Sequence, residues 1–132
     1  NVEFITSKQE GGVIEKKKKM MYYRNLKHVV KTIMEKLKIT LVNKKKIKTN
    51  KIYDLIFGAH CLIDSGKPWV ADIEYVGQFT VPMNRVNNKK TRNKISSILR
   101  KKNCKKILAW TEWTKKGILE EYPEIKEKVE VV

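Results

Sequence analysis

Residues 67–75 read Lys-Pro-Trp-Val-Ala-Asp-Ile-Glu-Tyr, and this stretch decides the fold class. A short apolar run that begins after a proline and ends at carboxylates is typical of a buried β-strand followed by polar side chains. Three other runs repeat the pattern, at residues 53–57, 106–110 and 128–132. The sequence therefore predicts four short strands.

Two helices are predicted between these strands. One spans about residues 88–102 and carries its isoleucines on one side, and the other spans about residues 112–121 and is ended by Pro123. Short strands that alternate with helices build an α/β fold, in which helices cover both faces of a mostly parallel sheet. We expect one such domain over residues 1–132.

The first third of the chain is predicted to hold a long amphipathic helix, at about residues 15–38. Its apolar residues recur at three- and four-residue steps, and lysines occupy the opposite face. We favour packing of this helix on the sheet, and insertion of residues 20–23 into a membrane interface is the alternative. Short strands are expected at residues 2–6 and 39–42, and a polar loop at residues 43–50.

The charge of the chain is strongly positive and unevenly distributed. Its 132 residues carry 30 Lys and Arg against 14 Asp and Glu, which gives a formal charge of +16. Residues 1–51 and 85–132 are basic, whereas residues 52–84 hold one lysine against four carboxylates. Solvated lysines are the favoured interpretation, and attraction to phosphates or anionic lipid headgroups is the alternative. A small basic nucleic-acid-binding module therefore stays open as an alternative function.

Composition excludes several classes of protein. Hydrophobic residues make up 41% of the chain, which is enough for a core, and no apolar run reaches the length of a membrane-spanning helix. Cys61 and Cys104 form no Cys-x-x-Cys pair, which excludes a zinc ribbon and a disulfide scaffold and favours a reducing, cytoplasmic setting. The chain begins with Asn1 and ends in a predicted strand, so we expect it to be part of a longer protein.

The candidate site consists of residues that follow the predicted strands. In an open α/β sheet, ligands bind outside the carboxyl ends of the strands, so these residues are expected at one edge. Asp72 and Glu74 lie two apart on an extended segment, so they share a face and are suited to hold hydroxyls or to act as bases. The candidates are Gly58, His60, Asp72, Glu74, Thr111 and Glu112.

Each candidate also has a purely structural interpretation. His60 could be a hydrogen-bonded structural histidine, and His28, which lies inside the helix pattern, is assigned a structural role. The two carboxylates could cap strand ends or pair with lysines. Thr111 before a helix is typical of an N-cap, with Glu112 in the positively charged first turn.

The tryptophans and the known motifs add little chemistry. Trp110 and Trp113 are expected in the core, and Trp69 is expected either in the core or stacked on a ligand. The chain has no P-loop, no Gly-x-Gly-x-x-Gly, no metal-ligand cluster and no Gly-x-Ser-x-Gly elbow. The sequence therefore predicts no metal and no bound cofactor.

Four segments, in their order along the chain, resemble a known enzyme family. Together they are similar to the N-terminal half of nucleotide-sugar glycosyltransferases with two Rossmann-like domains (the GT-B fold), in the group often called family four, and most of all to its archaeal-looking members. The similarity covers about residues 52–132 and includes neither the Gly-rich donor loop nor the C-terminal donor-binding domain. The segments are Asp-Leu-Ile-Phe-Gly-Ala-His (54–60), Lys-Pro-Trp-Val-Ala-Asp (67–72), Lys-Ile-Leu-Ala-Trp-Thr-Glu (106–112) and Lys-Val-Glu-Val-Val (128–132).

The resemblance implies a hexosyltransferase that moves a sugar from a nucleotide-sugar donor to a sugar or lipid-linked acceptor, without a metal. It implies that this chain is the acceptor-side Rossmann-like domain, one half of the GT-B fold, and is inactive without its C-terminal half. Such an enzyme is expected in the cytoplasm, peripheral on the inner face of an anionic membrane.

The resemblance also implies roles for the candidate residues. His60 matches the strand-end histidine that faces the interdomain cleft, and Thr111 matches the common serine before the helix. Glu74 stands where relatives often place a histidine that contacts the transferred sugar, which is a departure from the family pattern. On this basis His60 and Glu74 are the expected catalytic residues. The expected substrate-binding residues are Gly58, Asp72, Thr111 and Glu112.

Overall fold

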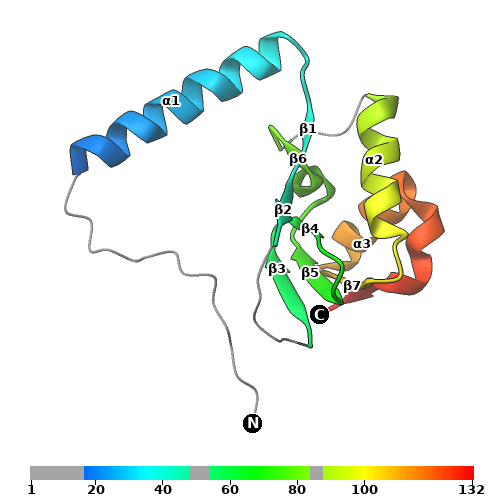
Figure 1. Ribbon diagram of the computed structural model, residues 1–132. Coiled ribbons are helices and arrows are strands. Elements are labelled where there is room, and N and C mark those ends of the chain that lie inside the picture. Colours follow the sequence, from blue (N-terminus) through cyan, green and yellow to red (C-terminus); the bar gives the residue numbers. More distant parts are fainter. Residues whose placement is uncertain (1–16, 48–53, 84–87) are drawn as a thin grey trace.

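The computed structural model describes residues 17–47, 54–83 and 88–132 (Figure 1). The strand expected at residues 2–6 lies outside the described residues. The elements, in chain order, are α1 (Lys17–Lys36), β1 (Leu41–Val42), β2 (Lys44–Lys46), β3 (Ile56–Ala59), β4 (Leu62–Asp64), β5 (Trp69–Ile73), the 3-10 helix η1 (Val76–Phe79), β6 (Thr80–Val81), α2 (Lys89–Leu99), β7 (Cys104–Ala109), α3 (Glu112–Glu121), the 3-10 helix η2 (Pro123–Lys128) and β8 (Val129–Val131).

The main sheet has four parallel strands in the order β3-β5-β7-β8. The predicted α/β class and parallel sheet are confirmed. Neighbouring strands are aligned so that their carboxyl ends meet at one edge, with Ala59 opposite Asp72 and Asp72 opposite Leu108. We call this the carboxyl edge.

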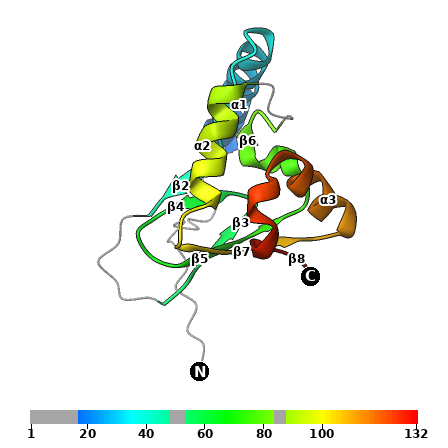
Figure 2. The same cartoon turned by 90° about the vertical axis from the view of Figure 1, so that its right-hand side faces the viewer.

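All the helices between these strands lie on one face of the sheet. The spatial order of the strands follows their order in the chain, and crossover connections between parallel strands are right-handed. Successive crossovers in one direction therefore pass over the same face, and Figure 2 shows α2, η2 and α3 together on that side. Within the described residues, the expectation that helices cover both faces is wrong, because the order of the strands never reverses.

The covered face forms the core. Trp69, Phe79, Ile107 and Tyr122 are fully buried there. Burial of one such large side chain stabilises the fold by about 1.5–3 kcal/mol. Trp69 is therefore a core residue, which decides between its two expected roles.

The opposite face of the sheet is exposed. Strand β3 alternates buried and exposed residues, and the side chain of Phe57 is 58% exposed. Val70 and Leu108 lie on the same face of the neighbouring strands and are half-buried. We call this surface the open face. Its residues are Phe57, Ala59, Val70, Asp72, Lys106, Leu108 and Glu130.

Two small pairings stand beside the main sheet. β1 pairs antiparallel with β6, and β2 pairs parallel with β4. The polar loop expected at residues 43–50 is therefore wrong for Lys44–Lys46, which form strand β2. The Lys44 Nζ lies 2.5 Å from Asp64 Oδ2, and Lys101 Nζ lies 3.2 Å from Asp64 Oδ1, so two lysines flank one carboxylate.

The long helix predicted near the N-terminus is confirmed as α1, but its packing is not. Leu26, Val29, Val30 and Ile33 on its apolar stripe stay exposed, from 46% at Val30 to 53% at Val29, and Leu37 just after the helix is 64% exposed. Figure 1 shows α1 extending away from α2 and α3. The expectation that α1 packs on the sheet is therefore wrong in this structure. None of the helices in the described part of the chain combines the length and the apolar character needed to cross a lipid bilayer.

Candidate functional site

Three side chains from three different segments meet at the carboxyl edge. The indole Nε1 of Trp110 donates to Asp72 Oδ2 over 3.2 Å, and the backbone N–H of His60 donates to Asp72 Oδ1 over 3.1 Å. The rings of His60 and Trp110 lie 5.4 Å apart between centroids, tilted by 57°. We call these three residues the edge cluster. His60 and Asp72 were expected to meet at this edge because both follow parallel strands, and the structure confirms that they do.

His60 has an unusual backbone. Its φ angle is +53°, in the left-handed region, where residues other than glycine carry a steric cost. The backbone N–H of His60 reaches both the backbone carbonyl of Asp72, at 3.2 Å, and its carboxylate. These contacts hold the strained turn after β3 and fix the direction in which the imidazole leaves the chain.

The imidazole of His60 is accessible on one side only. Its Nδ1 atom is buried and has no hydrogen-bond partner among the described residues, although it lies 3.9 Å from Asp72 Oδ2. The side chain as a whole is 40% exposed, so the exposure falls on the other ring atoms, which include Nε2. A histidine held in this way can accept or donate a proton, or a hydrogen bond, toward solvent at the edge.

Asp72 acts inside the protein. Its carboxylate is only 15% exposed, and both oxygens accept hydrogen bonds from the cluster. The geometry makes Asp72 a residue that positions His60 and Trp110. Its expected contact with substrate hydroxyls stays a prediction.

Glu74 has different neighbours from Asp72. Strand β5 ends at Ile73, and the backbone N–H of Glu74 donates to Gln78 Oε1 over 2.8 Å. The Glu74 carboxylate is exposed and contacts Gln78 Nε2 at 3.5 Å. Asp72 and Glu74 therefore have different hydrogen-bond partners, and their action as a pair on one ligand stays a prediction.

Asn43 is a site residue that sequence analysis missed. Its Nδ2 donates to the carbonyl of His60 over 2.9 Å and to the carbonyl of Gln78 over 2.8 Å. Asn43 thus links the turn that carries His60 to the 3-10 helix that contacts Glu74. No local signal marks it, because its partners lie 17 and 35 residues away in the chain.

Thr111 and Glu112 begin helix α3 at the same edge. The Thr111 hydroxyl accepts a hydrogen bond from the backbone N–H of Thr114 over 3.0 Å, so the N-cap interpretation is confirmed. Glu112 is exposed in the first turn, where a negative charge interacts favourably with the helix dipole. Capping explains both residue types, and binding of substrate by them stays a prediction.

Gly58 is required by close packing. A Cβ atom placed there would lie 2.8 Å from the carbonyl oxygen of Cys61 and 2.9 Å from Ile63 Cγ1. No side chain fits without displacement of the turn after β3. Contact between Gly58 and a ligand stays a prediction.

Neighbouring side chains decide what chemistry the edge can do. Trp110 is 47% exposed and Trp113 is 71% exposed, so the expectation that both lie in the core is wrong.

Burial raises the pKa of the Cys61 thiol, which follows His60 directly, so this cysteine is not a ready nucleophile at neutral pH. Within the described residues, no three His, Cys, Asp or Glu side chains group to hold a metal ion.

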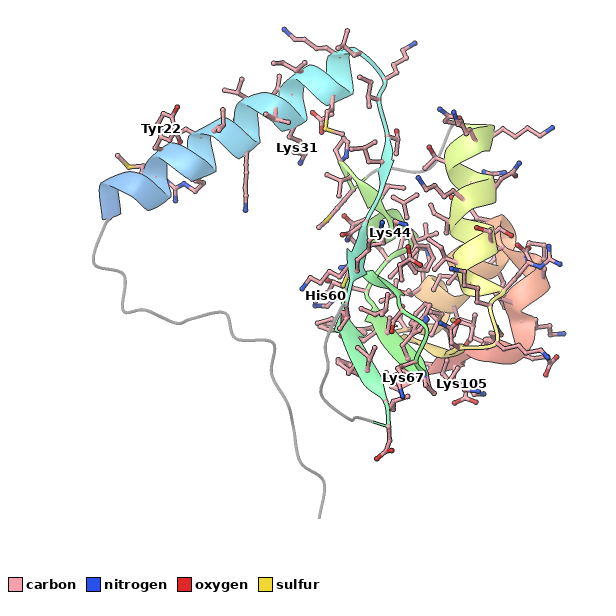
Figure 3. The ribbon with its side chains drawn as sticks, in the orientation of Figure 1. Tyr22, Lys31, Lys44, His60, Lys67 and Lys105 are labelled. Carbon is pink, nitrogen blue, oxygen red and sulfur yellow. The ribbon has the colours of Figure 1, made fainter. Side chains whose placement is uncertain are left out.

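Two surface hollows flank the sheet. One, of about 280 Å³, lies between η1 and α3, beside the carboxyl edge, and is lined by Tyr75, Trp113 and Glu120 among others. The other, of about 480 Å³, lies at the opposite edge and is lined by Lys46 and Lys101 among others. Figure 3 shows His60 apart from Lys67 and Lys105, which mark that opposite edge.

The edge cluster, with the exposed Glu74 and the aromatic hollow beside it, is the candidate site. It offers a held imidazole, an exposed carboxylate and exposed aromatic rings, which suit a hydroxyl-rich ligand. Comparison with known proteins adds no relative: no family model, no curated protein and no solved structure matches this chain.

Proposed function

We propose that this chain is the acceptor-side domain of a nucleotide-sugar glycosyltransferase with two Rossmann-like domains. The observation that carries the proposal is the edge cluster, in which His60, Asp72 and Trp110 converge at the carboxyl ends of a parallel sheet. The resemblance of residues 52–132 to the N-terminal half of such enzymes supports the same assignment.

In this proposal His60 acts at the acceptor hydroxyl. Its exposed ring atoms take or share the hydroxyl proton, while Asp72 holds the histidine and Trp110 in place. The exposed carboxylate of Glu74 orients a second hydroxyl of the transferred or accepting sugar. Thr111 and Glu112, both exposed at the start of α3, complete the wall on which the substrate rests, and Gly58 lets the turn that carries His60 pack closely behind it.

The second domain supplies the rest of the reaction. As the resemblance implies, the proposal assigns neutralisation of the donor diphosphate mostly to basic groups of a C-terminal half. Catalysis in such a cleft depends on positioning and electrostatics, so this chain alone is inactive. The acceptor is a sugar or a lipid-linked sugar, and the strongly basic surface suits an enzyme that works at an anionic membrane.

The test uses the full-length product of the gene and a panel of UDP- and GDP-sugars, with release of nucleoside diphosphate as the readout. His60→Ala is expected to lower kcat by about 100-fold or more, as loss of a proton-transfer group does. Asn93→Gln, on the exposed side of α2, is the matched control and is expected to keep full activity. Activity of His60→Ala equal to that of the control would refute the assignment of His60.

A salt titration separates the alternative function. A basic nucleic-acid-binding module would bind RNA or DNA with an affinity that falls steeply as salt rises, and would release no nucleotide from any sugar donor. Tight, salt-sensitive binding without transferase activity would replace the proposal with that alternative.

A further inference from the structure

We infer that the aromatic hollow, the surface hollow between η1 and α3, holds a neutral sugar ring as a second subsite beside the edge cluster. The inference rests on the proposed function, because it names the acceptor as a saccharide of at least two rings. The hollow has a volume of about 280 Å³, close to the lower end of the range of small-molecule sites. A single ring with its substituents is therefore the size of ligand that the hollow suits.

One wall of the hollow is a face of α3. Trp113, Gly117 and Glu120 follow one another at four- and three-residue steps, which places them on one side of the helix. Trp113 is 71% exposed, although it is the largest side chain of α3. An accessible tryptophan at a concave surface is typical of a ligand contact, because the indole offers a flat apolar face and an N–H donor.

Gly117 keeps the floor of the hollow open. Among the described residues, a Cβ atom placed there would meet only Val76 Cγ1 within 4 Å, at 4.0 Å, and none of the described glycines has a left-handed φ. Neither packing nor backbone conformation therefore requires glycine at this position. Glycine inside a helix also lowers stability relative to alanine. The missing side chain provides space between Trp113 and Glu120.

The opposite wall is the ring of Tyr75. A Cβ atom placed at Gly77 would lie 2.6 Å from Tyr75 Cε2 and 3.1 Å from the carbonyl oxygen of Met83. The ring therefore lies directly against the bare backbone of η1, and the absence of a side chain at Gly77 fixes its place. Tyr75 is half-buried, so part of its side chain stays accessible in the hollow.

The buried Thr114 holds the two walls together. Its hydroxyl lies 3.0 Å from Thr111 Oγ1 and donates to the carbonyl of Glu74. The start of α3 is thereby fixed to the turn between β5 and η1, so the hollow is preformed. Glu74 is two residues from Asp72, about 7 Å along an extended chain, so the hollow and the edge cluster adjoin across Glu74.

The charges at the rim of the hollow favour a neutral ligand. Lys116 and Glu120 carry opposite charges, and neither makes an ion pair among the described residues. An anionic ligand would meet Glu120, and a cationic ligand would meet Lys116. The chain as a whole has a formal charge of +16, but the hollow does not share this excess.

The same groups indicate which neutral ligand fits. The Lys116 ammonium only donates hydrogen bonds and the Glu120 carboxylate only accepts them, and a hydroxyl group can pair with either. A sugar ring carries hydroxyls around its rim and C–H groups on its faces. The C–H groups match the indole of Trp113 and the ring of Tyr75, and the hydroxyls match the rim.

The experiment measures sugar binding to the 132-residue chain by isothermal titration calorimetry. The probes are the methyl glycosides of glucose, mannose and galactose and the 1,4-linked disaccharides of the same sugars. At least one disaccharide is expected to bind about tenfold more tightly than its methyl glycoside, because its second ring gains an aromatic contact and hydrogen bonds in the hollow.

Two variants remove the second subsite. Gly117→Leu fills the floor and Trp113→Ala removes the indole, and each is expected to lower the affinity for that disaccharide about tenfold. Trp113→Phe keeps an aromatic face and is expected to lose less than Trp113→Ala. The matched controls, expected to stay within about twofold of the parent, are Gly66→Leu, where a Cβ atom has no neighbour within 4 Å, and Phe57→Ala, on the open face at 58% exposure.

Urea unfolding tests the role of Gly117 without a ligand. Gly117→Ala is expected to lower the unfolding constant about two- to fivefold, because alanine is the better helix former and its Cβ atom meets only ordinary contact. A Gly117→Ala variant less stable than the parent would show that packing requires the glycine, which overturns the inference.

The binding measurements overturn the inference in three ways. The first is that no disaccharide binds more tightly than its methyl glycoside. The second is that Gly117→Leu and Trp113→Ala bind the disaccharide as the parent does. The third is that these variants weaken binding of inorganic phosphate in place of binding of a sugar, which would assign the hollow to an anion.

Failure of the proposed function gives a different result. Release of nucleoside diphosphate from UDP- and GDP-sugars by the full-length product is measured separately. Disaccharide binding that Gly117→Leu weakens, without any such release, would support the sugar subsite and refute the glycosyltransferase. Release with the same KM for the disaccharide in the parent and in Gly117→Leu would refute the subsite and support the glycosyltransferase.

Discussion

Replacement of Asn43 by alanine should destabilise the carboxyl edge, because Asn43 links the turn that carries His60 to the 3-10 helix η1. The Asn43 carboxamide donates to the carbonyls of His60 and Gln78, at 2.9 Å and 2.8 Å, and both contacts are part-buried. Alanine removes the donor and leaves two carbonyls that water reaches poorly. The side chain makes no other hydrogen bond among the described residues, so the loss is confined to these two.

The expected magnitude follows from the two bonds. A hydrogen bond of this kind contributes a net 0.5–1.5 kcal/mol, so Asn43→Ala should lower the free energy of unfolding by about 1–3 kcal/mol. Asn43→Asp has the same shape, but an ionised carboxylate only accepts hydrogen bonds and faces two carbonyl oxygens. Asn43→Asp should therefore have a lower free energy of unfolding than Asn43→Ala at pH 7. Part of this stability should return as the pH falls to about 4, because the protonated carboxyl group again donates a hydrogen bond.

Urea unfolding followed by tryptophan fluorescence measures these differences, since Trp69 is fully buried in the core. Asn93→Ala is the matched control, because Asn93 is exposed on α2 and alanine is compatible with a helix there. A loss for Asn43→Ala within about 0.5 kcal/mol of the control would refute the bridging role. An Asn43→Asp variant as stable as the parent at pH 7 would refute the direction of the hydrogen bonds.

Three further predictions concern buried and paired groups. The hydroxyl of Tyr122 is buried without a hydrogen-bond partner among the described residues, and burial raises its pKa. Tyr122→Phe removes this unpaired group, so the free energy of unfolding should stay unchanged or rise by up to about 1 kcal/mol, as measured in urea. Burial raises the pKa of the Cys104 thiol to about 11, so reaction with a disulfide reagent at pH 8 should be on the order of 100-fold slower in the folded chain than in urea. Hydrogen bonds from Lys44 and Lys101 lower the pKa of Asp64, so its ionised form stabilises the fold above about pH 4, and this contribution is lost as the pH falls through the lowered pKa. Asp64→Asn should therefore have a lower urea midpoint than the parent at pH 7, and this difference should shrink as the pH falls below about 4.

The strands and helices of the second half could be predicted from the sequence because their signals are local. Helix α3 runs from Glu112 to Glu121, as the Thr111 cap and the proline at residue 123 indicate. Strands β5, β7 and β8 coincide with the apolar runs to within two residues at either end. The strand pair β2–β4 could not be found in this way, because three consecutive lysines carry no apolar pattern and their pairing depends on a partner 18 residues away.

The candidate site divides in the same manner. His60 and Asp72 were predictable, because strand-end polar residues in a parallel sheet reach one edge. Trp110 and Asn43 could not be assigned to the site from the sequence, because their contacts are with residues 38 and 17 positions away in the chain. A tryptophan that follows an apolar strand is predicted to lie in the core, and only the fold shows that the Trp110 N–H donates to the Asp72 carboxylate.

The sequence by itself determined the α/β class, the parallel strands and the amphipathic helix α1, because periodicity, caps and prolines act over a few residues. The tertiary structure alone decided which face of the sheet is covered, where the apolar stripe of α1 points and which groups surround His60. These depend on the order of strands in space and on pairings across tens of residues, and the hydrophobic pattern of a segment carries no information about its partner.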